Sequence, residues 1–464
     1  MQSIDYQYLR PKKAEALKKW CDFPVEVHDQ PAVWRGKNAT VLPLRADSSL
    51  LFGRGGVVDC EGNYVELSAI KNRVEYAYPF ENSQFRDEKV VYCGYLVNHW
   101  GHFLIEAVTR LWYFMERDAS VDKYVFFINE KEEREIKGNY RKFLELLKIW
   151  DKLEIINTPT TYREVVVPEL GIYCRESYVP QLISVFDEIA NNVVVDPVWD
   201  TPKKIYYSRS QFQKGIPFEF GFDSLDNFFE KNGYKVLFPE KVPLDQMIHY
   251  IRNSEVVATL SGSLPHNMLF ASNGQKVEIV ERLVISDDNQ TDVNRMRELD
   301  VTYIDANIPI YTIDFVGPFI MGYTEQLQRF AEDRGYEPPD DCYLTQKHYK
   351  KCFVQYMKAY KDLYQYRWFM HEWYGPFAES QMEGFQVGMS ILVIICAESG
   401  RSCGIIILNY ITLSSLSSGL SGDNKTRLGN QKGYWQMATI QVLKPKFHVE
   451  ECLAQVRECL EMGW

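Results

Sequence analysis

The chain has 464 residues, which is enough for two or three domains at roughly 100 to 200 residues each. Hydrophobic residues make up 46% of it and charged residues 25%, as in a globular protein rather than a disordered or fibrous one. The formal net charge of −11 argues against a general nucleic-acid binder, because phosphate contacts need clustered lysines and arginines, and the sequence has no such cluster.

The N-terminal residues 1–20 contain no apolar stretch of the kind that directs secretion. The longest apolar runs, 391–397 and 404–408, are too short to span a bilayer. The ten cysteines include no C-x-x-C pair, so we expect reduced thiols rather than a disulfide framework or a zinc site. Together these features predict a protein of the reducing cytoplasm.

Taken in chain order, residues 1 to 80 mix helix and short strands, with the GRGG sequence at 53–56 as a hairpin turn or loop. The hydrophobic pattern then alternates between strands and helices, which is typical of an α/β layer with a parallel sheet. The predicted elements are a strand at 90–92, a helix at 99–115, a strand at 124–128, a charged helix at 130–150, and strands at 153–156 and 164–167.

A helix at 179–194 leads into the proline-bracketed segment 196–202, which has the composition of an interdomain linker. Strand and helix patterns then resume, and two such units in tandem suggest a cleft between them. The elements predicted here are strands at 204–207, 235–238, 256–260, 276–280 and 301–304, and helices at 223–232, 244–253 and 264–271.

The character of the chain changes beyond about residue 310. Residues 340–377 form a strongly aromatic, predicted helical segment, in which a tyrosine and tryptophan stripe is more often core or interface than a ligand site. Residues 398–433 are rich in Ser, Gly and Asn, and 446–462 read as one amphipathic helix. We therefore predict three parts: an α/β domain at 1–195, a second α/β domain at 203–310, and a helical or irregular extension at 311–464.

The predicted helix at 99–115 carries His102, Glu106 and Arg110 every four residues, which places them on one stripe flanked by apolar side chains. Burying charge without partners is costly, so the stripe either pairs internally or lines a cleft. In the first interpretation Glu106 pairs with Arg110 and His102 satisfies the start of the helix. In the second, His102 and Glu106 are acid–base groups.

A second candidate site follows the strand predicted at 256–260. There Ser261, Gly262 and Ser263 form a turn before a helix, which would aim backbone N–H groups and a helix dipole at an anion. Arg209 ends the strand at 204–207 between two serines, and an arginine at the carboxyl end of a parallel strand points into the crevice where such sheets bind ligands.

Three ordered segments, HWGHFLIEAVTRLW at 99–112, KKIYYSRS at 203–210 and LSGSLPHNMLFASNGQKVEIVE at 260–281, resemble the motifs of glycosyltransferase family 61. The resemblance covers roughly residues 85–305. The sequence departs from the family pattern before Asn267, where Pro265 and His266 replace an apolar and threonine run, and at 272–273, where a proline is usual.

The resemblance implies a GT-B-like fold of two Rossmann-like domains with a cleft, with 1–195 as the acceptor-side domain and 203–310 as the nucleotide-sugar domain. It also implies an inverting hexosyl- or pentosyltransferase that takes a nucleotide sugar, usually a UDP-sugar. No D-x-D sequence occurs in the chain, which favours chemistry without a metal ion or other cofactor. His102, Glu106 and His99 are the catalytic candidates, with His102 nearest the substrate. The expected donor-binding residues are Arg209, Ser208, Ser210, Ser261, Gly262, Ser263 and Asn267, with Glu278 or Glu281 on the ribose.

Two alternatives remain open: a metal-dependent hydrolase with His99 and His102 as ligands, and a non-catalytic nucleotide or sugar binder that kept the fold. The expected setting is synthesis of a capsule or other surface polysaccharide at the cytoplasmic face of a membrane. The acceptor would be a glycan or a lipid-linked glycan, and the aromatic segment 340–377 could provide peripheral membrane contact.

Overall fold

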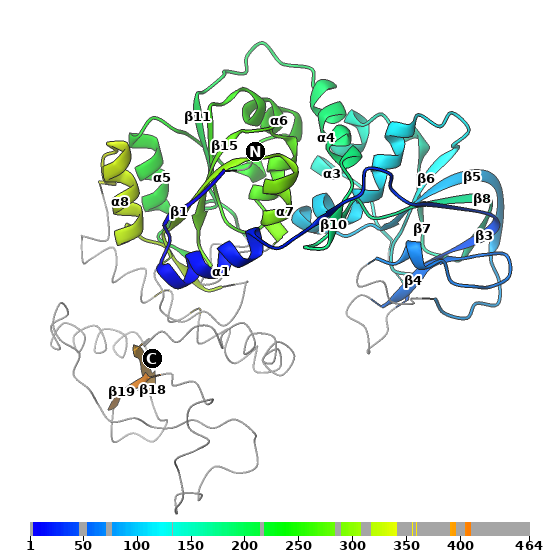
Figure 1. The fold of residues 1–464 in the computed structure, drawn as a ribbon, viewed down its shortest axis with the longest axis horizontal. Coiled ribbons are helices and arrows are strands. Elements are labelled where there is room, and N and C mark those ends of the chain that lie inside the picture. The colour runs from blue at the N-terminus through cyan, green and yellow to red at the C-terminus, as the bar shows by residue number, and fades with distance from the viewer. Residues whose placement is uncertain are drawn as a thin grey trace, which may run out of the picture. The chain divides into compact units, whose positions relative to one another are not determined.

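A computed structural model describes residues 3–45, 53–70, 77–131, 133–213, 218–283, 289–307 and 317–340, residues 355 and 359, and the strands at 390–395 and 404–409. The chain divides into two compact units. The first comprises Met1–Ile216, Phe222–Asn307 and Met321–Cys342, and the second comprises Pro217–Gly221, Ile308–Ile320 and Tyr343–Trp464. Both large sheets belong to the first unit (Figure 1).

One sheet of the first unit has the strand order β4-β3-β8-β5-β6-β7. Its strands are β3 (Val33–Arg45), β4 (Arg54–Val58), β5 (Gln84–Tyr95), β6 (Lys123–Phe127), β7 (Leu153–Ile156) and β8 (Thr160–Pro168). β5 runs parallel to β6 and β8, whereas β3 is antiparallel to β4 and β8. The sheet is therefore mixed rather than wholly parallel, because the long strand β3 closes one side by antiparallel pairing.

The other large sheet is parallel throughout, in the order β1-β16-β15-β14-β11-β13. Its strands are β1 (Ser3–Tyr8), β11 (Lys204–Tyr207), β13 (Lys235–Leu237), β14 (Val256–Leu260), β15 (Lys276–Glu281) and β16 (Asp300–Asp305). Parallel strands bury both faces, which explains their nearly continuous apolar runs. The mixed α/β fold with parallel strands agrees with the sequence prediction.

The helices of the first unit are α1 (Pro11–Cys21), α2 (Trp100–His102), α3 (Gly138–Leu146), α4 (Gln181–Asn191), α5 (Phe222–Lys231), α6 (Leu244–Asn253), α7 (Asn289–Met296) and α8 (Glu325–Arg334). Shorter 3₁₀ turns are η1 (Glu66–Ser68), η3 (Thr109–Glu116), η4 (Trp150–Lys152), η5 (Pro239–Lys241) and η6 (Pro265–Phe270), and η2 (Phe103–Ala107) is a π-helical turn. A small sheet joins β2 (Glu26–Val27), β10 (Ser177–Tyr178) and β9 (Ile172–Tyr173).

Several predicted elements have the bounds found in the structure, namely the strands at 153–156, 204–207 and 256–260 and the helix at 244–253. The GRGG prediction was wrong, because its last three residues begin β4 rather than a turn. Gly56 has a φ of +114°, and a Cβ there would lie 2.8 Å from Ser68 Oγ. This glycine therefore serves a close approach within a strand.

The N-terminal strand β1 lies beside β16 in the parallel sheet, although the predicted first domain of 1–195 contains it and the second does not. Figure 1 shows β1 and α1 in dark blue against the green elements of that sheet. α8 contacts β16 and β1 as well, although it falls within the predicted extension. Edge pairing uses backbone groups, which carry no side-chain pattern, so the sequence holds no signal of it.

A chain of aromatic rings connects the helices around the two sheets. Phe143 of α3 lies 5.2 Å from Phe103 of η2 and 6.1 Å from Phe270 of η6, measured between ring centroids, and Phe186 of α4 lies 5.0 Å from Phe270. All four rings are fully buried. One apolar core therefore extends from the first motif at 99–112 to the third at 260–281.

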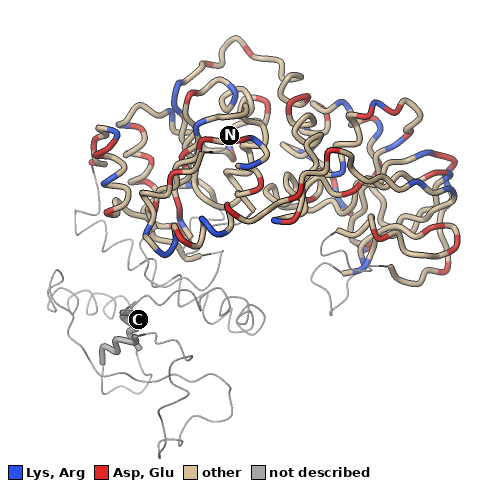
Figure 2. Tube along the Cα trace, in the orientation of Figure 1, with Lys and Arg blue, Asp and Glu red and all other residues tan. Residues whose placement is uncertain are grey.

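In the second unit, β12 (Glu219–Phe220) pairs in parallel with β17 (Phe319–Ile320), and β18 (Ser390–Ile395) pairs antiparallel with β19 (Gly404–Asn409). The predicted aromatic helix at 340–377 and the tail helix at 446–462 lie outside the described residues, apart from residues 340, 355 and 359. No helix in the described part of the chain is long and apolar enough to cross a membrane. Figure 2 shows charges of both signs interspersed along the described trace.

Candidate active site

The segment that carries the first motif is not the single α-helix that the sequence predicts for 99–115. It begins with three α-helical residues, continues as the π-helical turn η2, in which Val108 N donates to Phe103 O at 3.1 Å, and ends as the 3₁₀ helix η3. A π turn widens the spacing from four to five residues per hydrogen bond and is frequent at functional sites. The four-residue stripe is therefore broken between Glu106 and Arg110.

His102 and Glu106 form a hydrogen-bonded pair, with 3.0 Å between His102 Nδ1 and Glu106 Oε1. An ionised carboxylate only accepts, so Nδ1 carries the hydrogen, and in the neutral imidazole Nε2 keeps its lone pair. The His102 side chain is 43% exposed and that of Glu106 is 21% exposed. The imidazole therefore faces the open side of the pair and the carboxylate orients it from behind.

Arg110 has a different task. Its buried guanidinium donates to three backbone carbonyls, those of Pro168 at 2.9 Å, Leu67 at 2.8 Å and Ala69 at 2.7 Å. These bonds fasten the end of β8 and the turn η1 to the helical segment. The interpretation that Arg110 is the ion-pair partner of Glu106 is wrong, because the broken helix directs the arginine to the backbone.

The turn at 261–263 is formed by residues that follow β14. Gly262 adopts a φ of +110°, and a Cβ there would lie 2.6 Å from Arg282 Nη2. Arg282 donates from Nε to Ser261 O at 2.7 Å, and its backbone N–H donates to Ser261 Oγ at 3.0 Å. A buried guanidinium thus supports this turn from the neighbouring strand end.

The helix expected after this turn, at 264–271, is instead the six-residue 3₁₀ helix η6. The Ser261 N–H is already donated to Val280 O at 2.9 Å. A short 3₁₀ helix has a weak dipole, so the predicted seat for an anion on a helix N-terminus is not supported. Positive charge at the turn comes from Arg282.

The first and third motifs are in direct contact. A Cβ at Gly101 would lie 2.7 Å from Ser263 Oγ and 3.2 Å from His266 Cδ2. Trp100 Nε1 donates to Asn267 Oδ1 at 2.9 Å. These two distant segments therefore meet directly, and Asn267 binds the indole rather than facing an open site.

Arg209 belongs to the same group of side chains. It lies two residues after the end of β11, and its guanidinium carbon lies 4.6 Å from the centre of the Phe212 ring. The pKa of His99 is lowered by burial and by the nearby His102, His266 and Arg209, whereas Glu106 opposes the shift. The His99 and His102 rings are 4.9 Å apart. The cationic Arg209 and the neutral His99 therefore lie near each other.

The two serines beside Arg209 are bound to a carboxylate that sequence reasoning missed. Ser210 Oγ donates to Asp226 Oδ2 of α5 at 2.5 Å, and Ser210 N donates to Ser208 Oγ at 3.0 Å. Burial raises the pKa of Asp226 to about 6, against the opposing hydrogen bonds from Ser208 and Ser210. The hydroxyls predicted to bind the donor therefore position the Arg209 loop.

The two candidate ribose ligands lie apart from this group. Glu278, in the middle of β15, accepts from Tyr234 Oη at 2.6 Å, and burial raises its pKa. Glu281, at the carboxyl end of β15, is buried 3.2 Å from Lys13 Nζ. Tyr234 directly precedes β13 at the amino edge of the sheet. The structure therefore does not bring Glu278 to the site, and it pairs Glu281 with α1.

His266 is a further residue that the sequence prediction did not place in the site. Its Nδ1 lies 2.9 Å from Gln290 Oε1, and Gln290 Nε2 donates to Asn294 Oδ1 at 2.8 Å. The signal for it was its departure from the family pattern at this position. Arg282 could have been found by the rule applied to Arg209, because it too follows a parallel strand.

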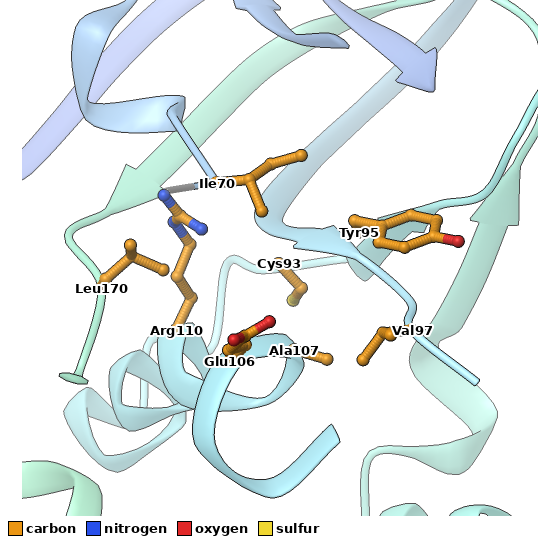
Figure 3. A pocket seen from close by; sticks show the side chains of 8 residues that line it. All are labelled: Ile70, Cys93, Tyr95, Val97, Glu106, Ala107, Arg110 and Leu170. Atoms are coloured by element: carbon orange, nitrogen blue, oxygen red, sulfur yellow. The ribbon is translucent and has the colours of Figure 1, made fainter. Parts of the chain in front are cut away.

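Glu106 also lines two hollows in the surface of the first unit. The smaller one is bounded by Cys93, Val97 and Arg110, and Figure 3 shows the Glu106 side chain directed into it. The larger one extends toward β9 and α7. Within the described part of the chain, no group of three or more His, Cys, Asp or Glu side chains is placed to hold a metal ion.

Residues 100–277 match the model of the glycosyltransferase 61 family. This part of the chain is similar to glycosyltransferase family 61. The match covers the segments that carry Trp100, His102 and Glu106, Arg209, and the turn at 261–263, so the recognition made from three motifs is confirmed. No curated protein sequence matches the chain. The family implies a glycosyltransferase, with a sugar donor and a glycan acceptor.

Proposed function

We propose that the chain is an inverting hexosyl- or pentosyltransferase that moves a sugar from a UDP-sugar to a hydroxyl of a glycan. The observation that carries this proposal is the contact of Gly101 with Ser263 and His266, because it brings the His102–Glu106 pair to the turn beside Arg209 and Arg282. The two sheets of the first unit would correspond to the two halves of a GT-B-type transferase.

In the proposed reaction His102 Nε2 takes the proton of the acceptor hydroxyl as the hydroxyl oxygen attacks the anomeric carbon. The bond from that carbon to the diphosphate breaks on the opposite face, so the configuration inverts and UDP departs. Glu106 holds the Nδ1–H and stabilises the imidazolium that forms, in the way a carboxylate orients a catalytic histidine. His99 borders this pair and stays neutral through its lowered pKa.

We propose that Arg209 and Arg282 neutralise the negative charge of the departing diphosphate. Ser208 and Ser210 would act through Asp226 by fixing the loop of Arg209. Ser261, Gly262 and Ser263 would border the diphosphate, with Arg282 rather than the N-terminus of η6 supplying the positive charge. We propose that no metal ion or other cofactor is required, on the ground that the sequence contains no D-x-D.

Steady-state release of UDP from UDP-glucose, UDP-galactose, UDP-N-acetylglucosamine and UDP-xylose tests the proposal, with and without EDTA. Glu106→Gln and His102→Asn should lower kcat by roughly 10²- to 10⁴-fold while calorimetric UDP binding is kept. Arg209→Ala should weaken UDP binding roughly ten- to hundredfold, because a charge-assisted hydrogen bond is lost. The exposed Arg163 of β8 provides a matched control, and Arg163→Ala should change neither quantity.

Each outcome selects one of the readings. Full turnover by both Glu106→Gln and His102→Asn would refute the catalytic assignment. UDP binding without turnover of any donor would favour a non-catalytic nucleotide binder. Loss of activity in EDTA that added metal restores would favour metal-dependent chemistry. The proposed setting, synthesis of a surface polysaccharide at the cytoplasmic face of a membrane, is tested by locating the protein in fractionated cells.

A further inference from the structure

Neither Arg209 nor Arg282 lines the larger hollow beside Glu106. Its walls come from three places: η2 with Glu106, the β9 region with Tyr173 and Glu176, and the start of α7 with Asn289 and Asp292. Glu106 is the carboxylate that orients His102, at 3.0 Å. A molecule in this hollow would therefore lie next to the proposed base.

The walls of the hollow are of two chemical kinds. Ile70, Leu170 and Ile172 give an aliphatic surface, and the ring of Tyr173 adds an aromatic one. The carboxylates and the amide of Asn289 offer hydrogen-bonding atoms. A sugar ring has a C–H face and a rim of hydroxyls, so this division of apolar and polar wall matches it.

The wall between β9 and α7 is held in place. Cys174 Sγ donates to Asn289 Oδ1 at 3.2 Å. The buried Asp292 accepts from Arg175 N at 3.0 Å and from Arg295 Nη1 at 3.2 Å. Such fixed polar groups bind a ligand at a low entropic cost.

The charged side chains that line the hollow are all acidic. Glu106, Glu176 and Asp292 line it, and no lysine or arginine occurs among the described residues that do so. Arg209 and Arg282 lie instead at the carboxyl ends of the parallel strands. An anionic group would be repelled from the hollow and attracted to the arginines.

We propose that this hollow is the acceptor subsite, and that it takes a neutral, hydroxyl-rich sugar residue and rejects uronic acids and phosphorylated sugars. This inference rests on the proposed function, since Glu106 and His102 act as the base in both. It adds that charge separates the two substrates: the anionic donor binds at Arg209 and Arg282, and the neutral acceptor binds in the hollow lined by acidic side chains.

Saturation-transfer NMR tests the inference in the presence of saturating UDP, with methyl β-glucoside, β-galactoside, β-xyloside and α-mannoside against methyl β-glucuronide. At least one neutral glycoside should bind, and the glucuronide should bind at least tenfold more weakly. Glu176→Lys should strengthen glucuronide binding, relative to binding of the neutral glycosides, by tenfold or more. Asn289→Ala should weaken binding of the neutral glycoside. Both variants should bind UDP with the affinity of the unchanged protein.

Glu15→Lys makes the same charge change at an exposed position of α1 and should leave all binding unchanged. The inference is overturned if the glucuronide binds as well as the glucosides, if no neutral glycoside binds, or if Glu176→Lys and Asn289→Ala have no effect. Because binding is measured without turnover, a protein that binds neutral glycosides here yet transfers no sugar would refute the proposed function alone.

Discussion

The indole N–H of Trp100 donates to the side-chain oxygen of Asn267 at 2.9 Å, across 167 positions of the chain. Asn267 is 2% exposed, and its own amide nitrogen donates to Leu264 O at 2.8 Å. Both polar ends of this amide are therefore used, one to shape the turn before η6 and one to hold the first motif against it. The position of the proposed base, His102, relative to Arg209 and Arg282 depends on this bond.

Replacing Asn267 by Ala should lower the free energy of unfolding by about 1–3 kcal/mol, because the partly buried indole N–H of Trp100 is left without its acceptor. Urea unfolding measures this loss. The double variant Trp100→Phe/Asn267→Ala is the control, since neither partner then remains. A coupling energy of zero in the double-mutant cycle would contradict the interpretation.

Gly101→Ala should damage both stability and transfer. The new Cβ would lie 2.7 Å from Ser263 Oγ, so the two motifs must move apart, at about 1–3 kcal/mol for an overpacked site. Thermal unfolding and the rate of UDP release report the two effects. Adding Ser263→Gly removes the nearest obstructing atoms and should recover part of both. If the single variant behaves like the unchanged protein, the two motifs are not in contact in solution.

Asp226 should make stability depend on pH. Its folded pKa of about 6 lies above its ordinary value of 3.8, so the folded state binds more protons between these values. Stability should then fall as the pH rises from 3.8 through 6, by roughly 3 kcal/mol in total. Asp226→Asn cannot ionise. Denaturant unfolding at pH 4 and pH 7.5 should therefore show the variant gaining relative to the unchanged protein as the pH rises, and a constant difference would count against the buried carboxylate.

His99 should respond in the opposite direction. Burial and the neighbouring histidines lower its pKa below the ordinary 6.5, so the unfolded chain binds the proton more readily. Its share of stability is complete above pH 6.5 and is lost as the pH falls below that value. Unfolding measured from pH 8 to 5 should show that His99→Asn is less sensitive to acid.

His28 provides a control for this measurement. The carboxylate of Glu169 raises the pKa of His28, so its contribution is present below pH 6.5 and is lost as the pH rises through the raised pKa. In His28→Gln the free energy of unfolding should therefore fall less as the pH rises above 6.5. If both variants follow the unchanged protein at every pH, neither histidine has the surroundings described here.

Much of the parallel sheet could be predicted, because each of its strands other than β1 is a short run with apolar residues, bounded by charged residues or turn residues. The bounds of β11, β14 and α6 needed nothing beyond the local pattern. The residues of the candidate site were predicted less evenly. His102, Glu106 and Arg209 were named with their neighbours, and the position of Arg282 after a parallel strand would have allowed its prediction. Asp226 joins the Arg209 loop through a contact with Ser210 that no local pattern records.

Arg110 and Glu278 show why the rest could not be predicted. Both were assigned from their spacing or their place at a strand, and both are bound elsewhere, Arg110 to three carbonyls and Glu278 to Tyr234. A periodicity states which side of an element a residue occupies only while the element stays regular. The π turn at Phe103–Ala107 broke that regularity, and the choice of partner was made by atoms distant in the chain.

The sequence by itself determined the alternation of strands and helices, the family, and the residue types that can carry proton transfer and bind phosphate, because these are written in neighbouring residues. The tertiary structure decided that β1 joins the parallel sheet, that Trp100 reaches Asn267, and that a hollow lined by acidic side chains opens beside Glu106. Each of these depends on groups brought together from separate stretches, and their energies arise only once the chain has folded.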